Sequence, residues 1–489
     1  MSIRRNTIYN LLGSFIPLLV ALVTIPLYLG VIGEARYGIL AIVWLLLGYF
    51  GLFDLGLGRA TAQRIASLKL GNPYKAAETF WTALFLNLGL GVVGGLLMWP
   101  IATYFFGNIL NLEEILRPEI EGAVPWLILA VPIATLIGVL SGTLQGTERF
   151  LELNLISVSG TVLFQLLPLI AATIWGADLR SLLPAALFAR LCTLLVLFTR
   201  CRLHVFQRHP FSFSMAEAGQ LLRFGGWVTV TAFVGPMMVT LDRFIIGALT
   251  GAKEVAYYTV PFQLAERSTI LANSLSSALF PRFARMAIDE ELSLAHEALR
   301  ILVIVTTPIV GLCVLLMQPF LGWWITPAFA AKASLVGQIV LLGFWINAAA
   351  RIPFAQLQAR GRPDLVAKCH LAEILPYFAS LYFGLSFFGL PGAALAFSVR
   401  VIADFLLLAI FSGLLQRALP QLIIPMILLI AAFLIGAGTT PTSRDWFVLV
   451  GLHLSLTLTW AWHKAPGPVR TVVITIFVSV TRHLAKSNP

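Results

Sequence analysis

The sequence predicts an all-α, polytopic membrane protein, and three observations support this prediction. Hydrophobic residues make up 59% of the 489 residues, charged residues only 11%, and the mean hydropathy is +0.90, whereas soluble domains carry about 25% charged residues. The apolar segments are long and continuous, unlike the alternating strands of about ten residues in a membrane β-barrel. No polar stretch is long enough for a separate catalytic domain, so we expect a core of packed helices.

The apolar segments predict fourteen membrane spans, since each span needs about twenty mostly apolar residues. They cover residues 7–30, 38–66, 77–106, 123–146, 153–176, 181–200, 220–249, 256–281, 298–325, 335–358, 365–388, 391–414, 420–438 and 446–463. The last two are the shortest, which leaves twelve as the alternative count. The first is too long for the apolar core of a signal peptide, so we expect it to remain as a helix.

Basic residues predict the orientation of the chain. With the N-terminus in the cytoplasm, 22 of the 33 Lys and Arg residues fall in cytoplasmic loops and termini or at the cytoplasmic ends of spans, six fall in external loops, and five lie deeper within spans. Basic residues stay on the cytoplasmic side of a membrane, so both termini are expected there. The net charge of +11 is thus a topology signal, and no nucleic-acid partner is predicted.

A weak internal repeat predicts how the spans are grouped. Leu144–Arg149 resembles Leu357–Arg362, and Leu29 through Gly38 resembles Gly247 through Tyr258, each match lying six spans apart. An even number of spans between copies gives a parallel repeat. We therefore expect an N-terminal six-helix lobe over 1–205, a C-terminal six-helix lobe over 206–416, an extra helix pair over 417–464, and a cytoplasmic interfacial amphipathic tail over 465–489.

Several motifs resemble those of the bacterial oligosaccharide flippases, the exporters of lipid-linked O-antigen and polysaccharide. They are Asn10, Gly13, Pro26, Gly33-Glu34-x-x-Tyr37-Gly38, Asp54-Leu55-Gly56-Leu57, Arg64 and Asp242-Arg243-Phe-Ile-Ile-Gly247. The resemblance implies two six-helix lobes in a V-shaped transporter arrangement. It also implies that the chain moves undecaprenyl-pyrophosphate-linked oligosaccharide from the cytoplasmic to the periplasmic leaflet of a bacterial inner membrane for cell-surface polysaccharide biosynthesis. Two extra C-terminal helices are similar to those that line a lipid-tail groove in lipid II flippases.

Arginines in or near the spans are the candidate substrate contacts, because a guanidinium binds pyrophosphate through bidentate hydrogen bonds and stays charged. Arg267 is the first candidate, since it lies about ten residues into its span, near mid-membrane at the rise of about 1.5 Å per residue. The other candidates are Arg243, Arg59, Arg64, Arg351 and Arg190. A structural role in charge neutralisation is the alternative for each of them.

Acidic residues in the same spans are candidates for ion coupling or for pairing with the arginines. They are Asp54, Asp242, Glu266 and Glu373. Arg400 and Asp404 lie four residues apart on one helix face, so we expect a structural pair. No cofactor, metal site or catalytic group is predicted, and a proton or sodium gradient is the expected source of energy.

Two other functions remain open at this stage. A cation-coupled multidrug or toxin exporter would present an acidic, apolar pocket. A membrane glycosyltransferase or polymerase would place its catalytic residues on sizeable external loops, which this chain lacks. The expected partners are the polyprenyl-pyrophosphate-linked glycan, the lipid bilayer, and a polysaccharide polymerase or chain-length machinery.

Overall fold

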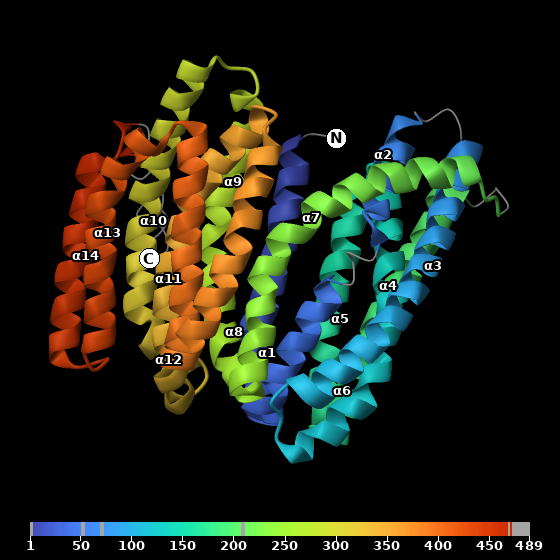
Figure 1. Ribbon diagram of the computed structural model, residues 1–489, viewed down its shortest axis with the longest axis horizontal. Coiled ribbons are helices and arrows are strands. Elements are labelled where there is room, and N and C mark those ends of the chain that lie inside the picture. The colour runs from blue at the N-terminus through green and yellow to red at the C-terminus, as the bar shows by residue number, and fades with distance from the viewer. Residues whose placement is uncertain (1–2, 50–53, 69–72, 207–210, 468–469, 472–489) are drawn as a thin grey trace, which may run out of the picture. The chain divides into compact units, whose positions relative to one another are not determined.

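The computed structural model describes residues 3–49, 54–68, 73–206, 211–467 and 470–471, and this part of the chain is helical without any strand (Figure 1). The α-helices are α1 (Ile3–Tyr49), α2 (Leu57–Ser67), α3 (Pro73–Tyr104), α4 (Arg117–Gly146), α5 (Phe150–Trp175), α6 (Leu179–Cys201), α7 (Met215–Thr250), α8 (Ala252–Glu266), α9 (Ile270–Phe283), α10 (Ile288–Trp324), α11 (Pro327–Ala359), α12 (Pro363–Ser412), α13 (Leu415–Gly438) and α14 (Arg444–Lys464). Nine helices in the described part are long and apolar enough to cross a membrane. The predicted all-α, polytopic fold is therefore confirmed.

Glycines with non-helical backbone angles explain where helices and predicted spans differ. α1 covers the first predicted span and much of the second, and it is interrupted at Gly33 (φ 78°). α12 covers the eleventh and twelfth spans, and it is interrupted at Gly389 (φ 63°). These positive φ angles are readily adopted only by glycine, so each of these helices consists of two arms.

Two predicted spans are broken within their length. A turn at Asp54–Gly56 interrupts the second predicted span, and α2 begins after this turn. Residues 50–53 lie outside the described part. The eighth span is divided by a short 3₁₀ helix, η6 (Arg267–Thr269), into α8 and α9. Both breaks occur at candidate functional residues, Asp54 in the second span and Glu266 with Arg267 in the eighth.

The contacts divide the chain into two compact units, Met1–Ala256 and Tyr257–Pro489. The first unit contains α1 to α7, so α7 belongs with the N-terminal helices although the predicted lobe boundary precedes it. The second contains α9 to α14, and the unit boundary falls within α8. The four-part division at residues 205, 416 and 464 stays a prediction. Most of the predicted tail, residues 472–489, lies outside the described residues.

Each unit has its own packed interior. In the first unit, α3, α4 and α6 bury Phe80, Leu140, Leu144 and Leu197 in one cluster. In the second unit, α11 is the most enclosed helix and packs between α10 and α12. α13 and α14 form a pair that packs against α10, as Figure 1 shows.

Candidate functional site

A polar cavity of about 530 Å³ lies within the second unit, between α9 and α11. It is lined by Asn273, Ser276, Ser277, Phe280, Arg351, Phe354, Ala355 and Gln358. Among the described residues, the lining includes a guanidinium, two amides, two hydroxyls and two aromatic rings, and no carboxylate. Amides and hydroxyls both donate and accept hydrogen bonds, and a guanidinium favours phosphate. The cavity therefore matches the chemistry of a sugar joined to a phosphate.

The spacing of the lining residues places one face of α9 and one face of α11 on the same cavity. The α9 residues lie at positions 273, 276, 277 and 280, and the α11 residues lie at 351, 354, 355 and 358. Each set follows the i, i+3, i+4, i+7 pattern of a single helix face. The Ser276 hydroxyl donates to the backbone oxygen of Arg351 at 3.2 Å, which ties the two faces together.

Arg351 is the cationic group of this cavity. Its side chain is half-buried, and its guanidinium carbon lies 5.9 Å from the centre of the Phe354 ring. Its Nε is buried and has no hydrogen-bond partner in the part of the chain that the structure describes. Asp404 and Glu266 are close enough to interact with its charge. An anionic ligand in the cavity would therefore satisfy a donor that the protein leaves unsatisfied.

Glu266 and Arg267 lie at the break between α8 and α9, and both side chains are exposed. The turn is held by the Thr269 hydroxyl, which donates to the backbone oxygen of Glu266 at 2.8 Å. Neither residue lines the cavity itself, although Asn273 lies on the helix that follows η6. The role of Arg267 as the main substrate contact stays a prediction.

A buried charged cluster lies within α12, across its Gly389 interruption. Arg400 Nη1 lies 3.6 Å from Glu373 Oε2, and His370 Nε2 lies 3.4 Å from Asp404 Oδ1. Glu373, Arg400 and Asp404 are all buried. Arg400 pairs with Glu373, and Asp404 lies beside the His370 imidazole, so Arg400 and Asp404 belong to a four-residue cluster rather than to an isolated pair.

The geometry of this cluster leaves several hydrogen-bonding atoms unsatisfied. Both carboxylate oxygens of Glu373 and Oδ1 of Asp404 are buried and have no hydrogen-bond partner among the described residues. Buried polar atoms normally find partners, so unsatisfied ones require an explanation. A site that takes up a proton or a small cation is one chemical explanation.

The candidate residues in the first unit have structural partners. Arg243 Nη1 lies 2.8 Å from Asp242 Oδ1, and both side chains are buried. The Asp54 carboxylate accepts hydrogen bonds from the backbone N–H groups of Gly56 at 2.7 Å and Gly58 at 3.3 Å. It therefore caps the start of α2.

Two further arginines of this unit differ in exposure. Arg190 lies 4.6 Å above the Phe164 ring and is half-buried. Arg59 is exposed on α2. The structure does not gather Arg59, Arg190 and Arg243 around a common cavity in the described part of the first unit.

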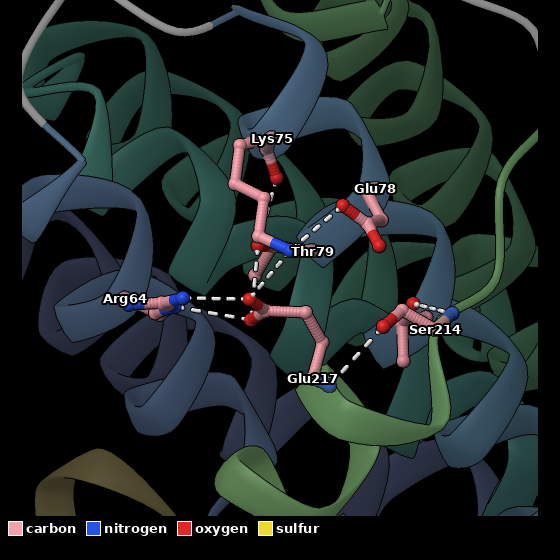
Figure 2. Close-up of polar contacts among 7 residues, drawn as sticks. Arg64, Lys75, Glu78, Thr79, Ser214 and Glu217 are labelled. Atoms are coloured by element: carbon pink, nitrogen blue, oxygen red, sulfur yellow. Dashed lines mark hydrogen bonds and ion pairs between the residues drawn. The ribbon is translucent and has the colours of Figure 1, made fainter.

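Arg64 belongs to a network at the predicted cytoplasmic end of the first unit, which Figure 2 shows in close-up. Its Nε and Nη2 donate to the two carboxylate oxygens of Glu217 at 3.0 and 2.6 Å. Lys75 Nζ lies 3.1 Å from Glu217 and 2.9 Å from Glu78. The network joins α2, α3 and α7, so it has the features of a structural connection.

Sequence reasoning missed the uncharged residues that line the cavity and the partners of two charged candidates, Arg64 and Asp404. The missed residues are Asn273, Ser276, Ser277, Gln358, His370 and Glu217. The run Asn273-Ser-Leu-Ser-Ser277 inside an apolar span was an available signal, because repeated polar side chains on one helix face indicate a lined cavity.

The helices and the polar cavity define the class, which is a polytopic membrane transporter. The structure resembles that of a multidrug resistance MATE family transporter of the MOP superfamily in its inward-facing conformation, with a TM-score of 0.68 and 15% identity, covering 84% of this chain and 98% of that one. It also resembles lipid II flippase MurJ in its inward closed conformation, with a TM-score of 0.68 and 15% identity, covering 93% of this chain and 98% of that one.

The sequence identifies the family within this class. Residues 3–287 match the family described as "Polysaccharide biosynthesis protein", and this chain belongs to that family. It is 29% identical to the "Putative O-antigen transporter" of Shigella flexneri, over 83% of this chain and 97% of that protein. It is 22% identical to lipopolysaccharide biosynthesis protein WzxC of Escherichia coli strain K12, over 60% of this chain and 57% of that protein. The chain is therefore a transporter and not an enzyme, as predicted.

Proposed function

We propose that this protein translocates a polyprenyl-pyrophosphate-linked oligosaccharide, with undecaprenol as the lipid, from the cytoplasmic to the periplasmic leaflet of a bacterial inner membrane. The observation that carries the proposal is the cavity between α9 and α11, where Arg351 lies among amides and hydroxyls. The family and the name of the Shigella flexneri relative, an O-antigen transporter, support the same substrate class. The polyprenyl tail stays in the lipid while the polar headgroup crosses.

Arg351 receives the pyrophosphate in this proposal, and the uncharged residues contact the sugars. A polar headgroup would otherwise cross about 30 Å of hydrocarbon without hydrogen-bond partners. Arg267, exposed at the break that precedes α9, extends the cationic path. Alternating access exposes the path to one side of the membrane at a time, with both termini in the cytoplasm and a polysaccharide polymerase or chain-length protein acting on the product.

Transport is coupled to a proton or sodium gradient through Glu373 in this proposal. Asp54 caps α2 and Asp242 pairs with Arg243, whereas the carboxylate oxygens of Glu373 have no hydrogen-bond partner. Glu373 is therefore the acid whose surroundings best suit reversible ion uptake. Glu373→Gln is expected to make transport independent of an imposed gradient, and transport that still follows the gradient would refute this assignment.

The central experiment measures movement of an undecaprenyl-pyrophosphate-linked oligosaccharide in liposomes that contain the purified full chain. A glycosidase outside the liposomes reports which glycans have reached the outer leaflet. Arg351→Gln is expected to lower the initial rate about tenfold, as loss of one charge-assisted contact worth about 1.4 kcal/mol would. Arg444→Gln removes an exposed charge at the start of α14 and serves as the matched control.

Failure of the wild-type protein to move this lipid would refute the proposed function. Liposomes loaded with a cationic dye test the alternative of a multidrug exporter in the same preparation. Gradient-driven dye export without movement of the lipid-linked glycan would assign the chain to that alternative.

A further inference from the structure

A second pocket, of about 390 Å³, lies within the second unit between α10, α13 and α14. It is separate from the cavity of α9 and α11 and shares no lining residue with it. It is lined by His296, Arg300, Val303, Ile304, Pro420, Gln421, Ile424, Pro425, Trp460 and Lys464. The proposed translocation path makes no use of these residues.

One end of this pocket is cationic. Arg300 Nη2 donates to the backbone oxygen of Lys464 at 2.9 Å, which brings the two side chains to the same mouth. Among the described residues, no carboxylate lines the pocket, and neither Arg300 nor Lys464 forms an ion pair with one. The mouth therefore carries two positive charges that an anion would neutralise.

Two further hydrogen-bonding groups of the lining have no partner in the described part of the chain. They are the buried Trp460 indole N–H, which has no acceptor, and the buried Gln421 Oε1, which has no donor. The Gln421 amide nitrogen lies 2.7 Å from Nδ1 of His296, which fixes this side chain against α10. An indole N–H can only donate, so the group that completes it must offer an acceptor oxygen.

The other end of the pocket is apolar. One face of α10 contributes His296, Arg300, Val303 and Ile304 to the lining. The lining therefore changes from polar to apolar along this helix. Ile424 and Pro425 of α13 complete the apolar part. Exposed apolar side chains continue from it along the same helix pair, at Ile423, Ile427 and Leu456.

We infer that this pocket binds the phosphodiester headgroup of an anionic phospholipid of the cytoplasmic leaflet. The phosphate lies between Arg300 and Lys464, an oxygen of the headgroup accepts from the Trp460 indole, and an acyl chain follows the apolar residues of α13. Lys464 ends α14 at the predicted cytoplasmic side, and the cytoplasmic leaflet is where anionic lipids attract basic residues. A soluble phosphate shares the headgroup chemistry but leaves the apolar end empty.

The test titrates the purified full chain with phosphatidylglycerol or phosphatidylcholine and measures the bound fraction by native mass spectrometry. The wild-type protein is expected to prefer phosphatidylglycerol. The double variant Arg300→Gln/Lys464→Gln is expected to lose affinity for it about tenfold or more. The control Arg282→Gln/Arg285→Gln removes the same charge from exposed positions at the end of α9 and should keep the wild-type affinity.

Two further arms separate the lipid from other sources of phosphate. Ile424→Trp fills the apolar end and is expected to weaken phosphatidylglycerol binding while both cations remain. Inorganic phosphate should not displace the lipid. Unchanged binding by the Arg300/Lys464 variant would overturn the site, and displacement by inorganic phosphate with no effect of Ile424→Trp would overturn the assignment to a lipid.

Discussion

Arg64 on α2 and Glu217 on α7 form a bidentate ion pair, with hydrogen bonds of 3.0 and 2.6 Å. The Glu217 side chain is 2% exposed and that of Arg64 is 29% exposed. Both guanidinium contacts use separate carboxylate oxygens, which is the geometry of the stronger ion pairs in proteins. The pair therefore fixes a short helix, α2, to the beginning of a long one.

Arg64→Gln is expected to destabilise the protein by about 1–3 kcal/mol, because it leaves a buried carboxylate with Lys75 as its remaining cationic partner. The measurement is thermal unfolding of the purified protein in detergent. Arg59→Gln is the matched control, since Arg59 lies on the same helix and is exposed. Equal melting temperatures for the two variants would contradict the structural role of the pair.

The same pair predicts a pH dependence of stability. The hydrogen bond from Arg64 holds the pKa of the Glu217 carboxyl below its ordinary value of 4.5, and Glu217 lies outside the predicted span 220–249. A carboxyl with a lowered folded-state pKa contributes stability above its unfolded-state pKa and loses that contribution as the pH falls through the lowered value. The stability difference between the wild-type protein and Glu217→Gln should be constant well above pH 4.5 and should shrink as the pH falls below 4.5 and through the lowered pKa of Glu217. A difference that persists under acid conditions would contradict this cause.

The sequence predicted the helices well because a hydrocarbon environment demands long apolar segments with internally satisfied backbones. The spans 123–146 and 420–438 correspond closely to α4 and α13. Breaks such as η6 were not predicted, because Arg267–Thr269 lies inside a segment whose composition still suits one span. A hydropathy average describes the mean polarity of a segment of the sequence, and it contains no information on the local hydrogen bonds that break a helix.

Charged residues were found from the sequence, but their partners were not. The in-span position of Arg400 was evident, and a partner four residues away on the same helix was the simplest expectation. Gly389 brings the two arms of α12 together, so Arg400 instead meets Glu373, 27 positions earlier in the chain. Such contacts depend on how the arms pack, which a hydropathy pattern does not contain.

Close packing of the α12 arms predicts that Gly392→Ala destabilises the second unit. A Cβ atom at residue 392 would overlap the backbone oxygen of Gly384. Backbone atoms cannot move aside as a flexible side chain does, so we expect a loss of about 1–3 kcal/mol. Gly438→Ala is the control, because nothing lies within 4 Å of its added Cβ. Thermal unfolding measures both, and an unchanged melting temperature for Gly392→Ala would contradict the close approach.

The charged cluster of α12 predicts strong coupling between Arg400 and Glu373. Arg400→Met leaves two buried carboxylates facing His370, and removal of one partner of a buried ion pair costs about 3–5 kcal/mol. Glu373→Leu in the same chain removes one of these carboxylates, so the double variant should be more stable than Arg400→Met alone. A double-mutant cycle of unfolding free energies measures the coupling. Additive effects would show that the two side chains act independently.

The uncharged face of α9 makes the final prediction, which rests on the proposed function. Asn273→Leu keeps a similar volume but removes an amide from the cavity, so contacts to sugar hydroxyls are lost while Arg351 remains. The initial rate of glycan movement in liposomes should fall about tenfold, as expected for one hydrogen bond worth about 1.4 kcal/mol. Ser274→Ala is the matched control, because the Ser274 hydroxyl donates to the backbone oxygen of Ile270 within its own helix and does not line the cavity. If both variants transport at the wild-type rate while Arg351→Gln does not, the cavity holds the pyrophosphate and the sugars lie elsewhere.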